Sequence, residues 1–150
     1  MKDGFLIVGA LNPNARVGDP AANARELVSL AEKAAEQGIS VAVTPELALT
    51  TATAGELYRS SCLLSEAETA LRDYLDGTAD LDLLSFVGLP ITVGGKLYNA
   101  AAVAFRGHLI GVVPKSVAAH RQDHQCVLRN GNGCQPSRTI ASEERRDMDV

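Results

Sequence analysis

The first third of the chain places one amphipathic stretch between two short apolar runs. Residues 5–11 form an apolar run without alternation, which is typical of a strand that is covered on both faces. In residues 19–38, apolar side chains recur at helical spacing, with Asp19 available as the N-cap and Gly38 as the stop. Residues 39–43 are again apolar and rich in β-branched side chains. This order predicts a right-handed crossover between parallel strands, and therefore an α/β fold.

Two further helices are expected in the middle of the chain. Residues 54–64 and 65–76 are both compatible with short amphipathic helices, with a break at Ser65 and a stop at Gly77. Strands are then expected at residues 83–89, 91–93, 96–105 and 109–113.

Two glycine-containing pairs separate the later strands. Gly94-Gly95 and Arg106-Gly107 favour tight hairpin turns, because glycine tolerates positive φ. A meander of strands therefore follows the crossover. We expect a mixed β-sheet with helices on a face.

Charge and composition direct attention to a small-molecule site. A net charge of −4 gives no electrostatic reason to expect nucleic acid or an anionic membrane as a partner. No segment approaches the roughly 20 apolar residues that a membrane-spanning helix needs. The three cysteines, Cys62, Cys126 and Cys134, are too few and too unevenly spaced for the disulfide framework of a secreted protein. We therefore expect a cytoplasmic protein.

Glu46 and Lys115 are the two charged residues that directly follow buried-looking strands, each after a proline. Open α/β sheets bind their ligands at the carboxyl ends of strands, which makes both residues candidates for a site. The alternative interpretation is that they are ordinary solvated charges, as most charged residues are.

Four motifs resemble those of the nitrilase, or carbon-nitrogen hydrolase, superfamily. Residues 43–50 (VTPELALT) are similar to the segment around its catalytic glutamate, and residues 111–116 (GVVPKS) to the segment around its catalytic lysine. Together with residues 87–90 (VGLP) and 97–103 (LYNAAAV), they look most like the N-terminal glutaminase domain of glutamine-dependent NAD synthetases. The resemblance runs in the expected order over residues 4–116.

The resemblance implies a fold and a chemistry. The fold would be about half of a nitrilase-like αββα sandwich. The catalytic residues would be Glu46 as general base and Lys115 as stabiliser of the oxyanion, acting with a cysteine thiolate that attacks the side-chain amide of glutamine. A raised pKa of the Glu46 carboxyl would suit both proton transfers.

The same resemblance implies partners and cofactors. The substrate would be glutamine or another small amide, and the hydrolytic half would need neither a cofactor nor a metal. ATP and Mg would enter only through association with a synthetase domain that amidates deamido-NAD. Homo-oligomers are expected on the same basis.

The nucleophile is the point at which the sequence departs from the family. Cys126 and Cys134 follow Lys115 too closely and in unrelated sequence, and Cys62 lies in a helical stretch, where we expect it to pack as a small apolar group. We therefore expect the chain to be truncated after the lysine motif and inactive by itself. Residues 1–116 would be the hydrolase part, and residues 117–150 a divergent tail that is disordered or frameshifted.

Two weaker signals have simple interpretations. The zinc-type ligands His120, His124, Cys126 and Cys134 lack the usual paired spacing, so an unstructured polar tail is favoured over a metal site. The resemblance places Tyr98 and Asn99 on a strand near the proposed site, but a structural role is favoured for both, since polar strand residues often pair locally.

Other functions compete with the glutaminase hypothesis. Within the superfamily, a free-standing amidase or carbamoylase would use the same glutamate and lysine. A different class of hypothesis is a non-catalytic remnant that binds or does nothing. Half of a sandwich would expose apolar surface, so poor solubility or oligomerisation is expected.

Overall fold

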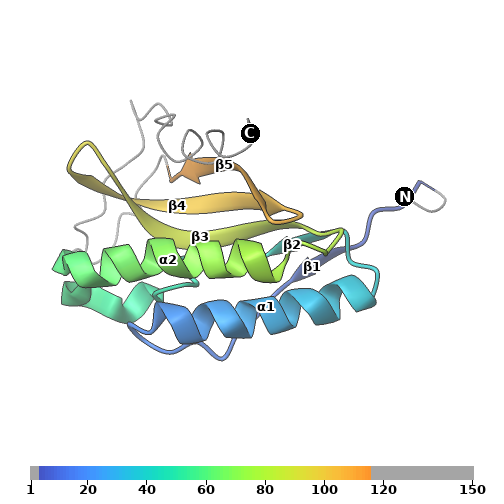
Figure 1. Cartoon of the computed structure of the whole chain (residues 1–150), viewed down its shortest axis with the longest axis horizontal. Coiled ribbons are helices and arrows are strands. Elements are labelled where there is room, and N and C mark those ends of the chain that lie inside the picture. The colour runs from blue at the N-terminus through green and yellow to red at the C-terminus, as the bar shows by residue number, and fades with distance from the viewer. Residues whose placement is uncertain (1–3, 116–150) are drawn as a thin grey trace, which may run out of the picture.

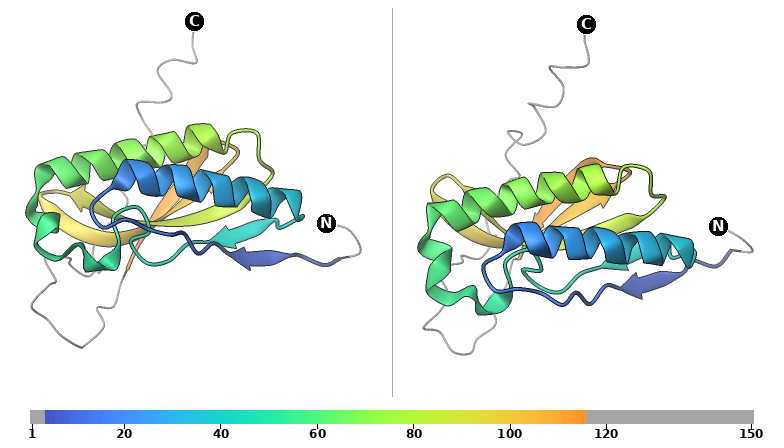
Figure 2. Two further views of the ribbon diagram at one scale, coloured as in Figure 1. Left: turned by 90° about the horizontal axis from the view of Figure 1, so that it is seen from below. Right: turned by 60° about the horizontal axis from the view of Figure 1, so that its bottom comes forward.

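The computed structural model describes residues 4–115, which fold into one mixed β-sheet with helices over one face (Figure 1). The strands lie in the order β1-β2-β3-β4-β5; β1, β2 and β3 run parallel, and β4 and β5 continue antiparallel. Figure 2 shows α1 and α2 side by side over the sheet. The elements are β1 (Val8–Ala10), α1 (Pro20–Glu36), β2 (Val41–Val43), η1 (Ala52–Arg59), α2 (Ser61–Gly77), β3 (Leu84–Val93), β4 (Lys96–Phe105) and β5 (His108–Pro114).

The α/β class and the mixed sheet are confirmed. One helical layer and one sheet are two of the four layers of the expected sandwich. The core lies between them, with Leu27, Tyr74, Val87 and Leu89 almost completely buried. No helix within residues 4–115 is both long and apolar enough to cross a membrane.

Helix α1 begins and ends where its capping residues predict. The Asp19 side chain accepts a hydrogen bond from the Ala22 backbone N–H at 3.0 Å, which satisfies one of the free donors of the first turn. Gly38, just past the last turn, has φ +77°, a conformation that costs glycine little.

The break between the next two helices is at Ser60, and the expectation of a break at Ser65 is wrong. Ser65 is exposed inside α2, whose buried face passes it without interruption. Side chains spaced for one helical face are selected by packing against the core, and a serine on the solvent side does not stop such a helix. The preceding segment is a kinked 3-10 helix, because Gly55 lies outside helical φ and ψ. The buried face of α2 comprises Leu63, Ala67, Ala70, Leu71, Tyr74 and Leu75.

Strand β3 continues through Pro90, and the expectation of two strands divided there is wrong. On its β2 side, the carbonyl oxygen of Phe86 accepts from Thr44 N at 2.9 Å. The carbonyl oxygen of Gly88 accepts from Leu49 N at 3.1 Å on the same side. Backbone groups alternate along a strand, so Pro90 points the same way, and its missing N–H removes no bond to β4.

Strand β1 is shorter and more exposed than the apolar run suggests. It spans three residues at the edge of the sheet, and Phe5 and Val8 are 80% and 66% exposed. The expectation that both faces of the run are covered is wrong within the described residues, because the helices cover only one face of the sheet (Figure 2).

The two hairpins are confirmed. Both residues of each turn have positive φ: Gly94 and Gly95 between β3 and β4, and Arg106 and Gly107 between β4 and β5. Such turns match the twist of antiparallel strands. They bring the end of β5 back beside β4, where Lys115 follows.

Candidate active site

Glu46 and Lys115, which are 69 residues apart in the sequence, form an ion pair. The Lys115 Nζ lies 2.6 Å from Glu46 Oε1. Glu46 follows β2 and Lys115 follows β5, so the sheet brings together two side chains that each come just after a strand. Both remain half-exposed in the described part of the chain, with side-chain exposures of 50% and 40%.

The segment that carries Glu46 crosses β3 at Gly88. The Gly88 backbone N–H donates to the Thr44 hydroxyl at 3.0 Å, and its carbonyl oxygen accepts from Leu49 N at 3.1 Å. A Cβ at this position would lie 2.6 Å from Leu47 N and closer still to the Pro45 carbonyl oxygen. The glycine is therefore required for the close approach of two backbones.

The turn after Glu46 has unusual backbone geometry. Leu47 has φ +53°, which is uncommon for a residue with a Cβ. Thr50 N and Thr51 N both donate to the Leu47 carbonyl oxygen, at 2.9 and 2.7 Å. Strained residues of this kind persist where the surroundings determine them, and they cluster at functional sites.

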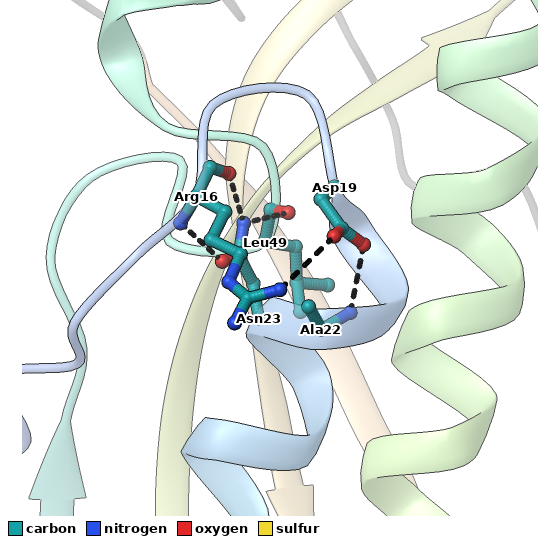
Figure 3. Close-up of polar contacts among 5 residues, drawn as sticks. All are labelled: Arg16, Asp19, Ala22, Asn23 and Leu49. Atoms are coloured by element: carbon teal, nitrogen blue, oxygen red, sulfur yellow. Dashed lines mark hydrogen bonds and ion pairs between the residues drawn. The ribbon is translucent and has the colours of Figure 1, made fainter.

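A buried asparagine fixes this turn to the start of α1 (Figure 3). Asn23, 1% exposed, donates its side-chain amide to the carbonyl oxygens of Leu49 at 3.0 Å and Arg16 at 2.8 Å. Its Oδ1 accepts from Arg16 N at 2.7 Å. Asn23 thus joins the loop before α1 to the segment that follows Glu46.

Asn99 lies at the site, as the resemblance implies, although the sequence analysis favours a structural role for it. It lies on β4, is 9% exposed, and donates its side-chain amide to Glu46 Oε1. Its carbonyl oxygen also accepts from Lys115 N at 2.8 Å, so it contacts both candidate catalytic residues. The signal available in the sequence was a polar side chain immediately before an alanine run on a strand.

The electrostatics of Glu46 differ from the expectation. The hydrogen bond from Lys115 lowers the pKa of the Glu46 carboxyl below its ordinary value, assisted by the charge of Lys115 and the hydrogen bond from Asn99. Partial burial acts in the opposite direction and is outweighed. Within the described residues the pKa of Glu46 is thus lowered, where the sequence analysis expects it to be raised, because the hydrogen bond from Lys115 outweighs the loss of hydration.

An open hollow lies beside the pair on the helix-free face of the sheet. Its volume is about 280 Å³, close to the roughly 300 Å³ at which small-ligand pockets begin. The glutamate and lysine supply charge, and small or apolar side chains supply the walls. It is lined by Thr44, Pro45, Glu46, Phe86, Gly88, Asn99, Ala100, Ala101, Val113, Pro114 and Lys115.

Cys62 is exposed, and the expectation that it packs in the core is wrong. It occupies the solvent side of the first turn of α2, where its thiol contacts Glu66 Oε1 at 3.4 Å. That hydrogen bond and the negative charge of Glu66 raise the pKa of the Cys62 thiol. A thiol held in its neutral form is a poor nucleophile.

The other two cysteines and the zinc-type ligands of the sequence analysis belong to the tail. Cys126 and Cys134 lie outside the described residues, as do His120 and His124, and so does the tail 117–150 as a whole. Within residues 4–115 there is no group of three or more histidine, cysteine or acidic side chains that could hold a metal ion.

Comparison with curated proteins identifies relatives by sequence. Over 113 residues the chain is 38% identical to the glutamine-dependent NAD(+) synthetase of Mycobacterium tuberculosis and 34% identical to that of Mycobacterium leprae. Each alignment covers 75% of this chain, which spans only 17% of the length of these relatives. No protein-family model matches the chain.

Solved structures share the fold. The glutamine-dependent NAD(+) synthetase from Cytophaga hutchinsonii matches with a TM-score of 0.67 at 22% identity, covering 77% of this chain and 20% of that one. An amidase from Nesterenkonia sp. matches with a TM-score of 0.69 at 19% identity, covering 87% of this chain and 50% of that one. A variant of the Nesterenkonia AN1 amidase is described as a nitrilase-superfamily protein. The sequence relatives of the chain are therefore glutamine-dependent NAD(+) synthetases, and its fold is shared with such a synthetase and with an amidase of the nitrilase superfamily.

Proposed function

We propose that this chain provides the glutamate and lysine of a glutaminase site, which hydrolyses the side-chain amide of glutamine and releases ammonia for NAD synthesis from deamido-NAD. The observation that carries the proposal is the contact between Glu46 and Lys115 beside an open hollow, in a chain with NAD synthetase relatives. Glutamine is proposed as the substrate because the names of these relatives specify it.

Glu46 would act as the base in this reaction. It would take the proton from a cysteine thiol, the thiolate would attack the amide carbon, and the proton would pass to the departing ammonia. A water molecule would then attack the resulting thioester, giving its proton to Glu46, which returns a proton to the cysteine sulfur. The described residues contain no cysteine placed for the attack, since Cys62 is exposed on α2.

Lys115 would stabilise the negative oxygen that develops during each attack. An ammonium group has three N–H donors, and one is used by Glu46, which leaves two for a substrate oxygen. Donors aimed at a developing oxyanion are often the largest single contribution to acyl-transfer catalysis.

Neither a cofactor nor a metal has a part in this hydrolytic chemistry. ATP and Mg would act in a separate synthetase unit, where deamido-NAD is activated and amidated. The chain spans 17% of the length of its curated relatives, so NAD synthesis as a whole is proposed only for a protein that includes the remainder.

A free-standing amidase or carbamoylase is the second candidate. The fold match to an amidase, of which this chain covers half, supports it. The sequence relatives at 38% and 34% identity favour the glutaminase, because all of them depend on glutamine by name. A non-catalytic remnant is the third possibility, and it predicts that Glu46 and Lys115 are dispensable in every setting.

A chimera tests the proposal. Residues of this chain replace the aligned 113 residues in the Mycobacterium tuberculosis relative, and glutamine-dependent ammonia release and NAD formation are measured. We expect activity with glutamine, and a loss of at least about 10²-fold in Glu46→Gln or Lys115→Met chimeras. Turnover with free ammonium controls for an intact synthetase. An ammonium-active chimera that ignores glutamine but hydrolyses other amides would establish the amidase alternative instead.

A further inference from the structure

We propose that Asn99 is a positioning residue for Glu46, holding Oε1 of the carboxylate so that Oε2 is presented for proton transfer. This inference rests on the proposed function for its chemical meaning. Its geometry and its test are independent of any turnover.

The two donors to Glu46 converge on one oxygen. The side-chain amide of Asn99 and the ammonium of Lys115 both donate to Oε1, and neither uses Oε2. A carboxylate gripped at a single oxygen has a fixed orientation, with the lone pairs of its second oxygen still available to accept a proton. The arrangement therefore separates the oxygen that anchors from the oxygen that reacts.

The two donors differ in how firmly they are held. Asn99 is 9% exposed in the middle of the sheet, with Pro90 opposite it on β3 and Lys115 N bonded to its carbonyl oxygen at 2.8 Å. Lys115 has a long side chain that is 40% exposed. A buried asparagine with few rotatable bonds loses less entropy in keeping one geometry than an exposed lysine does.

The difference in how firmly the two donors are held becomes important when Lys115 donates to a substrate oxygen. A reorientation of the ammonium toward an oxyanion weakens its hold on Glu46. Asn99 is neutral and exchanges no proton at working pH, so it keeps Glu46 in place through both proton transfers. Lys115 therefore supplies the positive charge, and Asn99 fixes the orientation of the Glu46 carboxylate.

Titration of Glu46 in the full chain tests this role without substrate. The carboxyl carbon of Glu46 is followed by NMR against pH, assigned from its absence in Glu46→Gln, with the other glutamates as internal references. Asn99→Ala removes the donor. Alanine suits this strand, which already carries it at the next three positions. We expect the titration midpoint of Glu46 to rise by about half a pH unit. Asn99→Leu, which retains volume, should produce the same rise.

A matched control separates this effect from general damage. Ser85→Ala removes a buried polar group from the same sheet, on the face covered by the helices, where Ser85 Oγ donates to Ala104 O at 3.5 Å. It should leave the Glu46 midpoint unchanged. A midpoint that stays at the parent value in whichever Asn99 variant folds overturns the proposal, as does an equal rise in Ser85→Ala.

The outcome is also separable from that of the chimera. A glutamine-inactive chimera together with a raised midpoint would overturn the glutaminase proposal and leave the positioning role standing. An active chimera together with an unmoved midpoint would overturn only the role of Asn99.

Discussion

Gly88 and Leu47 approach so closely that a Cβ on the glycine would lie 2.6 Å from the Leu47 nitrogen. The contact joins the middle of β3 to the segment that carries Glu46. Any side chain at residue 88 must push that segment away from the sheet, and with it the carboxylate that meets Lys115.

Gly88→Ala should therefore destabilise the fold and displace Glu46. We expect a loss of about 1–3 kcal/mol in the free energy of unfolding, as for other overpacked sites, measured by urea denaturation. Gly111→Ala on β5 is the matched control, because an added Cβ there meets nothing within 4 Å. Equal stability of the two variants would show that the crossing over β3 is not as tight as described.

Asn23→Ala should lower stability more than a typical surface substitution. The change leaves three polar partners without the amide: the Leu49 carbonyl, and the carbonyl and N–H of Arg16. Stranding buried polar groups costs about 1–3 kcal/mol, which sets the expected loss in chemical denaturation. Asp19→Ala, which removes the helix cap from the same region, should cost about 1 kcal/mol. A smaller effect of Asn23→Ala than of Asp19→Ala would contradict the role assigned to the hydrogen bonds of Asn23.

The pair of Glu46 and Lys115 should make stability depend on pH in the acid range. Lys115 lowers the pKa of Glu46 in the folded chain, so the unfolded chain binds a proton more readily in acid. The stabilisation is complete above the ordinary glutamate value of 4.5 and is lost as the pH falls through the lower folded-state value. Both side chains are more than one-third exposed, so the amount is below about 1 kcal/mol.

The contribution of the pair is measured from the free energies of unfolding of the parent chain and of Glu46→Gln, each at pH 7 and pH 3. Between pH 7 and pH 3 the parent should lose more stability than the variant, by less than about 1 kcal/mol. A larger loss in Glu46→Gln would reverse the assigned sign.

The helix-free face of the sheet should promote self-association. Val43 and Val113, on β2 and β5, are 45% and 58% exposed on that face, and larger exposed apolar patches favour association. Sedimentation of the full chain should depend on concentration. Val43→Lys with Val113→Lys should shift the population toward monomer, whereas lysine at the already exposed Leu57 on η1 should not. A concentration-independent monomer would refute the expectation.

Local sequence patterns determined most of the elements. The cap at Asp19, the stop at Gly38 and the glycine-containing turns act within a few residues, so their effects can be read from neighbours in the chain. The motifs around Glu46 and Lys115 are also short stretches of sequence, and they are recognised by their resemblance to those of a known family. Their positions just after expected strands make both residues candidates for a site.

Tertiary structure decided what depends on partners far away in the chain. Pro90 can lie within β3 because its backbone points away from β4, and Ser65 can lie within α2 because the buried face passes it. The lowered pKa of Glu46 and the role of Asn99 both arise from side chains brought together over 53 and 69 residues. Hydrogen bonds and ion pairs act over a few ångströms of space whatever the separation in sequence, so only the folded sheet reveals that Asn99 and Lys115 both donate to the same oxygen of Glu46.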